Sequence, residues 1–221
     1  MTIQTQLDSF RISWEARVGE TIDSLVRGDI ENLRTSGILD YTAQAGDPWP
    51  KTNKLVDAHG KPMDLGALLQ EKNTIVTFYR GGWCPYCNLE LRAYQELLDE
   101  IQSAGGALVA VSPELPDHAL TTSEKNDLRY TVASDVGGTL ASALGIRFTL
   151  SDGVRPFYEK AGHALPERNG DGIWALPMPA TFVVARGGRI AASFIEPDYR
   201  KRLEPSQALR ALLALPVTAN T

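Results

Sequence analysis

The sequence predicts an α/β protein in which helices flank a central mixed sheet and a helical extension precedes the sheet. Apolar runs typical of buried strands alternate with helical periodicity between residues 74 and 145. Two later apolar runs, residues 181–185 and 189–195, flank Arg186-Gly187-Gly188, which is a strong hairpin signal. The sheet is therefore expected to combine parallel strands with an antiparallel hairpin.

Composition and charge narrow the classes of partner. The 221 residues, 43% of them hydrophobic, suffice for one sizeable domain with an appendage. A net charge of −5 argues against a nucleic-acid or anionic-membrane partner. No apolar stretch approaches the roughly 18 residues of a membrane span, and residues 1–10 lack a basic region followed by an apolar core. We therefore expect a cytoplasmic protein.

The N-terminal extension is predicted to form one or two amphipathic helices. Its apolar stripe consists of Leu7, Phe10, Trp14, Val18, Ile22, Leu25 and Val26. Helix breakers crowd residues 46–50, so we expect an extension over residues 1–40 and a main domain over residues 41–216. The polar face is not Lys-rich, so the stripe is better suited to covering the core or forming a homodimer than to a membrane.

Turn and capping signals predict the first elements of the main domain. Residues 54–61 predict a short hairpin, and Asp64 caps a short helix that reaches Gln70. Residues 74–78 are a buried strand. A helix follows, ending at Gly105-Gly106, because one face collects Cys87, Leu91, Tyr94, Leu97, Leu98 and Ile101.

The second half continues the alternation of strands and helices. The apolar run 107–111 is typical of a parallel strand buried on both faces. Further helices are predicted at about 116–126, 139–144 and 205–214, and a further strand at 130–133. Residues 151–176 lack clear periodicity, which indicates an insertion with a functional or interface role.

The only two cysteines, Cys84 and Cys87, stand between the strand at 74–78 and the following helix. A helix N-terminus stabilises a thiolate through its dipole and free N–H groups, so this placement predicts a redox dithiol. A metal site would need two more ligands, and His59, His118 and His163 lack tight ligand spacing. No glycine-rich turn follows a strand at nucleotide-binding spacing, so we expect no cofactor.

This order of elements is thioredoxin-like, and the chain resembles the peroxiredoxin-like proteins of the AhpC/TSA family (alkyl hydroperoxide reductase and thiol-specific antioxidant) over about residues 45–213. The resemblance implies a thioredoxin-like fold and a thiol-dependent peroxidase. The matching pieces are residues 46–49, 57–61, 74–87, 134–138, 140–145 and 179–184.

The active sequence departs from the family's Pro-x-x-x-Thr-x-x-Cys motif. With Cys84 as the peroxidatic cysteine, Thr77 stands at the Pro position and Gly81 at the Thr position. The Arg usually found before the later Thr-Phe is replaced by Pro179, where thioredoxins carry a cis-proline beside the dithiol. A cis bond at Met178-Pro179 would signify a shaped site.

The position of the dithiol suggests roles for its neighbours. Cys84 is expected to be the nucleophile at the helix start, with Pro85 filling the first turn and Cys87 resolving the intermediate to a disulfide. Arg80 is the nearest cation in sequence and is expected to stabilise the thiolate or orient a peroxide. The aromatic residues Tyr79, Trp83 and Tyr86 could form the walls of a substrate pocket or could equally be packing residues. The basic run Arg200-Lys201-Arg202 is expected to be a solvated face.

Three functions remain open from the sequence. The first is a peroxidase for hydrogen peroxide or alkyl hydroperoxides, regenerated by thioredoxin, glutaredoxin or a low-molecular-weight thiol. The second is a thiol–disulfide oxidoreductase that acts on proteins through the same Cys-x-x-Cys. The third is a redox sensor in which the disulfide switches the insertion at residues 151–176.

Overall fold

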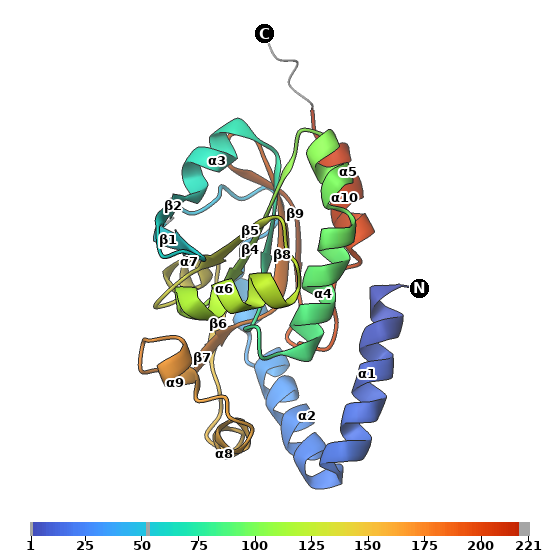
Figure 1. The fold of residues 1–221 in the computed structure, drawn as a ribbon. Helices are drawn as coiled ribbons and strands as arrows, with labels where there is room; N and C mark the ends of the chain where they lie inside the picture. Colours follow the sequence, from blue (N-terminus) through green and yellow to red (C-terminus); the bar gives the residue numbers. More distant parts are fainter. Residues whose placement is uncertain (1, 52–53, 217–221) are drawn as a thin grey trace.

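A mixed seven-stranded sheet forms the centre of the computed structural model, which describes residues 2–51 and 54–216 (Figure 1). The strand order is β2-β1-β5-β4-β3-β8-β9. The strands are β1 (Lys54–Asp57), β2 (Pro62–Asp64), β3 (Thr74–Phe78), β4 (Ala107–Ser112), β5 (Thr131–Ser134), β8 (Ala180–Ala185) and β9 (Arg189–Ile195).

The middle of the sheet is parallel and its flanks are antiparallel. β3 pairs with β4 and β4 with β5 in parallel, whereas β8 runs antiparallel to β3, and β1 antiparallel to β5. The predicted hairpin of β8 and β9 is present, with a register shift between Val183 and Val184. Strands β3 and β8 are almost wholly buried, since helices cover both faces of the sheet. The predicted thioredoxin-like architecture is confirmed.

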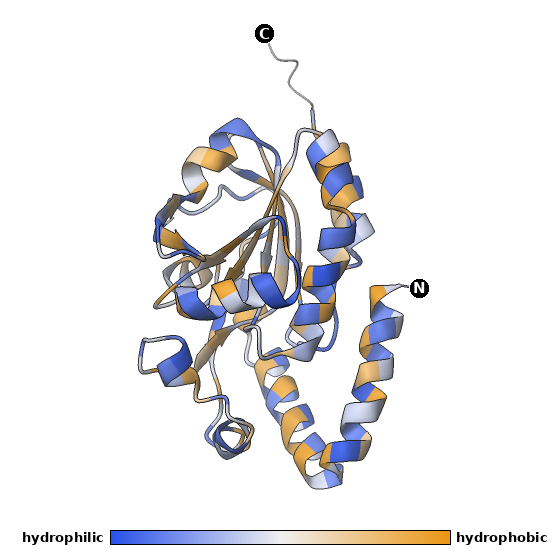
Figure 2. Cartoon of the chain, in the orientation of Figure 1, coloured by the Kyte–Doolittle hydropathy of each residue, from blue (hydrophilic) through white to orange (hydrophobic). Residues whose placement is uncertain are grey.

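Two layers of helices enclose the sheet, and each has its own apolar core. On one face, Ile75 and Val183 pack with α4 (Pro85–Glu96), α5 (Leu98–Ser103), α6 (Pro116–Lys125) and α10 (Pro205–Leu213). On the other face, Val76 and Phe182 pack with α3 (Leu65–Glu71) and α7 (Thr139–Ala143). Figure 2 shows hydrophobic strands between helices that are hydrophobic on one side and hydrophilic on the other. Successive side chains of a strand point to opposite faces of the sheet, so each central strand contributes to both cores.

The helix expected after the dithiol is two helices, α4 and α5, so that prediction was wrong in one respect. At Leu97 the backbone has φ −98° and ψ 2°, and its N–H bonds to the carbonyl of Tyr94, three residues back, at 3.1 Å. This tighter turn interrupts the α-helical hydrogen bonding. Tyr94, Leu98 and Ile101 nevertheless all remain in the core.

The N-terminal extension is a hairpin of two helices, α1 (Ile3–Val18) and α2 (Glu20–Thr35), that leans against the main body (Figure 1). The chain reverses at Gly19, whose φ of +79° lies in the region that favours glycine. Ile3 and Leu7 are buried in the same core as α4. Leu7 and Phe10 of the stripe therefore cover this core, whereas Leu25 is 48% exposed. The division of the chain at residue 40 stays a prediction. No helix in the described part of the chain has the length and apolarity needed to cross a bilayer.

The aperiodic segment 151–176 contains two short helices, α8 (Arg155–Lys160) and α9 (Leu165–Arg168). It is framed by β6 (Arg147–Thr149) and β7 (Ala175–Pro177), which pair antiparallel as a separate small sheet. A satellite core of Leu150, Val154, Tyr158, Leu165 and Leu176 holds the segment together. Elements this short leave no periodic signal, which is why the sequence showed none.

The packing of α1 predicts that replacing two side chains of similar size on that helix by alanine has different effects on stability. Leu7→Ala is expected to lower the free energy of unfolding by about 2 to 4 kcal/mol, because it opens a cavity in the shared core. Leu7 is 0% exposed and Ile12 on the same helix is 61% exposed, so Ile12→Ala is the matched control and is expected to change stability little. Urea unfolding measures both, and equal losses would contradict the placement of α1.

Candidate active site

The dithiol occupies the junction of β3 and α4, as the sequence predicts. Cys84 is the N-cap of α4, with φ −87° and ψ 115°, and Pro85 is the first helical residue. Pro85 lacks the N–H that would be unsatisfied at this position. Cys87 lies one turn along the helix, and the backbone N–H of Arg80 donates to its sulfur at 3.5 Å. The helix start therefore carries both sulfurs, and the loop after β3 contacts that of Cys87.

Both thiols are buried, yet their acidities are shifted in opposite directions. Burial alone raises the pKa of Cys84, but a hydrogen bond from Cys87 and the charges of Arg80 and Arg202 outweigh it and lower the pKa to about 6. Burial and the neighbouring Cys84 raise the pKa of Cys87 well above its usual value. Cys84 is therefore the thiolate at neutral pH and Cys87 the thiol.

Arg80 lies beside the dithiol inside a cage of aromatic rings. Its guanidinium carbon is 3.8 Å from the ring centroid of Tyr199, 5.1 Å from that of Trp83 and 5.7 Å from that of Tyr158. The guanidinium also donates a hydrogen bond to the hydroxyl of Tyr158. Arg80 is 3% exposed, so its charge acts on Cys84 with little screening by solvent.

Arg202 is a second cation at the dithiol, and the expectation of a solvated Arg200-Lys201-Arg202 face was wrong for this residue. Its side chain is 1% exposed, and Nη2 donates to the sulfur of Cys87 at 3.4 Å. Its Nε lies 2.6 Å from a carboxylate oxygen of the buried Glu90. Arg200 is also largely covered, with a side-chain exposure of 11%. A run of three cations is usually exposed, but here other parts of the fold cover two of the three.

The loop before Cys84 leaves no room for a side chain at Gly81 or Gly82. Gly81 has φ +149°, and a Cβ there would lie 2.2 Å from Nε1 of Trp83. A Cβ on Gly82 would lie 1.9 Å from the hydroxyl oxygen of Thr122. The Trp83 indole thus fills the space beside Gly81, the position that corresponds to the threonine of the Pro-x-x-x-Thr-x-x-Cys motif. The N–H of Gly82 donates to Glu114 at 2.7 Å, and Glu114 is paired with Arg168 of α9 at 2.8 Å.

A cleft of about 340 Å³ opens onto Cys84. Trp83 and Tyr86 line it, as the pocket interpretation of these residues requires, but Tyr79 does not and is 0% exposed in the core. Pro179 lines a smaller neighbouring cavity of about 20 Å³. The lining of the larger cleft is Phe10, Trp14, Arg17, Arg80, Trp83, Cys84, Pro85, Tyr86, Phe157, Tyr158, Ala161, His163 and Tyr199.

The walls of this cleft come from parts of the chain that the sequence did not connect with it. Phe10 of α1 packs edge-on against Tyr86 at 5.0 Å, and Trp14 packs edge-on against Phe157 of α8 at 6.2 Å. Trp83 meets the ring of His163 at 4.8 Å. The amphipathic pattern of α1 pointed only to burial, and the segment 151–176 carried no pattern at all, so neither signal identified the contacts.

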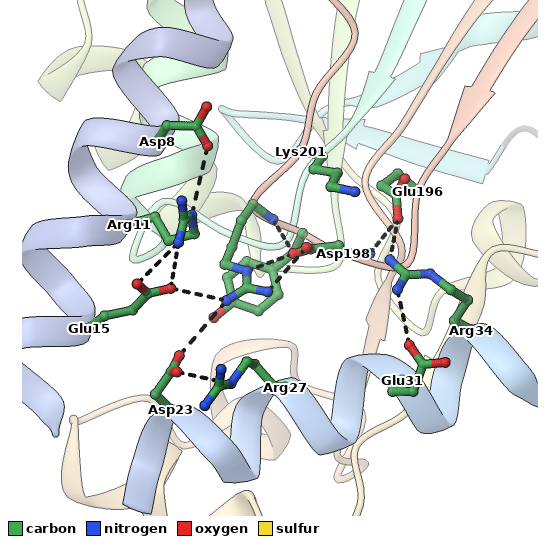
Figure 3. A network of polar contacts seen from close by, with 12 residues as sticks. Asp8, Arg11, Glu15, Asp23, Arg27, Glu31, Arg34, Glu196, Asp198 and Lys201 are labelled. Atoms are coloured by element: carbon green, nitrogen blue, oxygen red, sulfur yellow. Dashed lines mark hydrogen bonds and ion pairs between the residues drawn. The ribbon is translucent and has the colours of Figure 1, made fainter. Parts of the chain in front are cut away.

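Charged side chains fasten the helical hairpin to the segment that carries Tyr199 and Arg202 (Figure 3). Arg200 approaches Glu15 of α1 at 3.7 Å and Asp23 of α2 at 3.9 Å, and it binds Asp198 at 2.8 Å. Arg34 of α2 reaches Glu196 at 3.1 Å. The hairpin therefore helps to position two residues that surround the dithiol.

Two further expectations concern Pro179 and metal binding. Within residues 2–51 and 54–216 no peptide bond is cis, so Met178-Pro179 lacks the shape suggested by its position. In the same described residues no group of three or more His, Cys, Asp or Glu side chains is arranged to hold a metal ion.

The charges around Cys84 predict its titration. Thiolate absorbance at 240 nm is expected to rise with a midpoint near pH 6, because Cys84 ionises with a pKa of about 6. In Cys84→Ser this contribution is lost and only the titration of Cys87 remains. Arg80→Met is expected to move the midpoint to higher pH by about one unit or more, because a buried cation is lost. Arg129→Met is the control, since this arginine is 58% exposed in its side chain and pairs with Asp99 instead. An unchanged midpoint in Arg80→Met would contradict the electrostatic role of Arg80.

Solved structures of other proteins have a similar fold. Peroxidoxin BcpB from Mycobacterium tuberculosis superposes with a TM-score of 0.62 at 20% identity, covering 79% of this chain and 99% of that one. Reduced Prx3 from Vibrio vulnificus superposes with a TM-score of 0.61 at 15% identity, over 77% and 99% of the two chains. At these identities the likeness shows a shared fold.

Sequence relatives agree with this placement. Peroxiredoxin Bcp of Escherichia coli K12 is 27% identical over 103 residues, which span 47% of this chain and 65% of that protein. Thiol-disulfide oxidoreductase ResA of Bacillus thuringiensis is 21% identical over 151 residues, or 68% of this chain and 69% of that protein. The AhpC/TSA family model matches residues 45–193, which include β3, the dithiol and β8. The chain therefore belongs to the AhpC/TSA family.

Proposed function

We propose that this protein is a thiol-dependent peroxidase that reduces hydrogen peroxide or alkyl hydroperoxides. The observation that carries the proposal is the setting of Cys84. It is a buried sulfur with a pKa lowered to about 6, it lies at a helix N-terminus beside a second thiol, and it faces a cleft of about 340 Å³. A reactive thiolate with a small-molecule entrance suits a peroxide substrate.

The proposed reaction has two steps. The Cys84 thiolate attacks one peroxide oxygen, the O–O bond breaks, and the alkoxide or hydroxide leaves as an alcohol or water after taking a proton, so Cys84 becomes a sulfenic acid. Cys87 then attacks the Cys84 sulfur, which releases water and forms a Cys84–Cys87 disulfide. Arg80 supplies positive charge for the thiolate and for the departing oxygen, because its buried guanidinium lies among the groups that lower the pKa of Cys84.

Related proteins support this class of reaction. Peroxiredoxin Bcp is a sequence relative, and Prx3 of Vibrio vulnificus, which shares the fold, forms a complex with H₂O₂. The bacterioferritin comigratory protein of Xanthomonas campestris, also of similar fold, has alkyl peroxide reduction activity. The aromatic lining of the cleft is compatible with the apolar part of an alkyl hydroperoxide.

Turnover requires a reductant for the disulfide. Two electrons must come from thioredoxin, glutaredoxin or a low-molecular-weight thiol, because the Cys84–Cys87 pair stores the oxidising equivalents. We propose the cytoplasm as the compartment, since it keeps such reductants in the thiol form. A homodimer remains a prediction from the apolar stripe of the first helices.

A thiol–disulfide oxidoreductase is the second candidate, favoured by one observation. The alignment with ResA extends over 68% of this chain, further than the alignment with Bcp, and the Cys-x-x-Cys at a helix start suits disulfide exchange. However, Cys84 is 1% exposed, and a protein disulfide must reach that sulfur directly.

Peroxide kinetics test the proposal. Stopped-flow oxidation of Cys84 is expected to be far faster than that of a free thiol and to fall about tenfold per pH unit below pH 6, because the thiolate is the reactive form. After one equivalent of hydroperoxide, mass spectrometry is expected to find an intramolecular disulfide in the wild type and a sulfenic acid at Cys84 in Cys87→Ser. Oxidation no faster than that of a free thiol would overturn the peroxidase.

Insulin reduction separates the two candidates. A peroxidase with a buried Cys84 is expected to turn over insulin slowly and peroxide quickly in the same preparation. Fast insulin turnover combined with slow peroxide oxidation would instead establish the oxidoreductase. Cys84→Ser is the control for both measurements, because it removes the nucleophile and leaves Cys87.

A further inference from the structure

The segment between β9 and α10 carries Arg202, whose guanidinium touches the second sulfur of the dithiol. Nη2 of Arg202 lies 3.4 Å from Sγ of Cys87, and Nε lies 2.6 Å from Oε2 of Glu90. The side chains of Arg202 and Glu90 are 1% and 2% exposed. The guanidinium therefore bridges a thiol and a carboxyl group almost completely away from solvent.

The guanidinium is also fixed on its third side. Its Nη1 donates to the backbone carbonyls of Tyr199 and Lys201. Glu90 lies three residues after Cys87 on α4, so both partners of Arg202 project from the same helix. A planar group bound at every nitrogen keeps its orientation toward the sulfur.

We propose that Arg202, held by Glu90, is a catalytic residue of the second step, in which it stabilises the Cys87 thiolate that attacks the oxidised Cys84. This inference rests on the peroxidase proposed above. In the step, the S–H bond of Cys87 and the S–O bond of Cys84 break and an S–S bond forms. The proton and the hydroxide leave together as one water molecule.

Arg202 can stabilise the Cys84 thiolate in the first step and the Cys87 thiolate in the second, because the charge of Cys84 changes between the steps. In the reduced protein the negative Cys84 opposes ionisation of Cys87, while Arg202 and Arg80 favour it. A sulfenic acid at Cys84 is neutral, so this opposition disappears and both cations act on the one sulfur that can still ionise. Among the described residues, Glu90 and Tyr79 also interact electrostatically with Cys87.

Glu90 can support ionisation of Cys87 only through Arg202, whose guanidinium contacts both the carboxylate and the sulfur. Burial raises the pKa of Glu90 to about 7, against the lowering effect of Arg202. An isolated carboxylate beside Cys87 would disfavour a second negative charge there. Paired with Arg202 at 2.6 Å, it holds the guanidinium in place instead.

The pKa of Cys87 in the absence of the Cys84 charge tests the proposal independently of peroxide. In Cys84→Ser, thiolate absorbance at 240 nm reports Cys87 alone. Adding Arg202→Met and Glu90→Gln together removes both partners without leaving a lone buried charge, and is expected to raise the Cys87 pKa by about one unit or more. The same pKa in both proteins, each folded by circular dichroism, would overturn the proposal.

A kinetic arm follows the step itself. After a pulse of saturating peroxide, disulfide formation is expected to be about tenfold slower or more in Arg202→Met/Glu90→Gln, and Arg202→Lys is expected to recover part of the rate because it keeps the charge. The control is Arg147→Met/Asp171→Asn. These two residues form a half-buried ion pair, 2.8 Å between Nη2 and Oδ2, that does not contact the dithiol. An unchanged rate would refute the role of Arg202. If the peroxidase itself fails, the wild type shows no Cys84 oxidation, while the titration still decides the role of Arg202.

Discussion

Two guanidinium groups buried against one pair of sulfurs are the constraint on which the rest of the site depends. A thiolate hidden from water is costly unless positive charge lies beside it, and here Arg80 and Arg202 supply that charge. Each cation must itself be compensated. Arg80 meets the faces of three aromatic rings, and Arg202 meets Glu90 and two backbone carbonyls. The placement of aromatic and acidic residues around the dithiol follows from this need.

The need for compensation explains why remote parts of the chain converge here. Tyr158 comes from α8, Tyr199 and Arg202 precede α10, and Phe10 and Trp14 come from α1. The ion pairs of Arg200 and Arg34 attach the helical hairpin to the segment that carries Tyr199 (Figure 3). Because Arg200, Asp23 and Asp198 are largely covered, with side-chain exposures of 11%, 7% and 10%, these ion pairs fix the position of the segment against the hairpin. The N-terminal extension and the segment 151–176 are thereby parts of the site.

Local patterns predicted what local physics decides. The strand 74–78, the proline at the helix start and the Asp64 cap follow from apolar runs and from hydrogen-bonding needs within a few residues, and all three are present. Arg202 could not be found in this way, because 115 residues separate it from the sulfur that it touches. Nor could Tyr158, which belongs to a helix of six residues. Such contacts are properties of the assembled fold, and a run of charges or a short aperiodic segment carries no trace of them.

The two glycines before Cys84 limit how this active sequence can change. A Cβ at Gly81 would collide with Trp83 and Glu114, and a Cβ at Gly82 would collide with Thr122. A single substitution of Gly81 by threonine would therefore restore one residue of the motif of related proteins and at the same time disrupt the loop, since the indole of Trp83 would have to leave first. The two glycines and the side chains of Trp83, Glu114 and Thr122 are therefore one packing unit, and a change at either glycine also displaces a side chain that borders the dithiol loop.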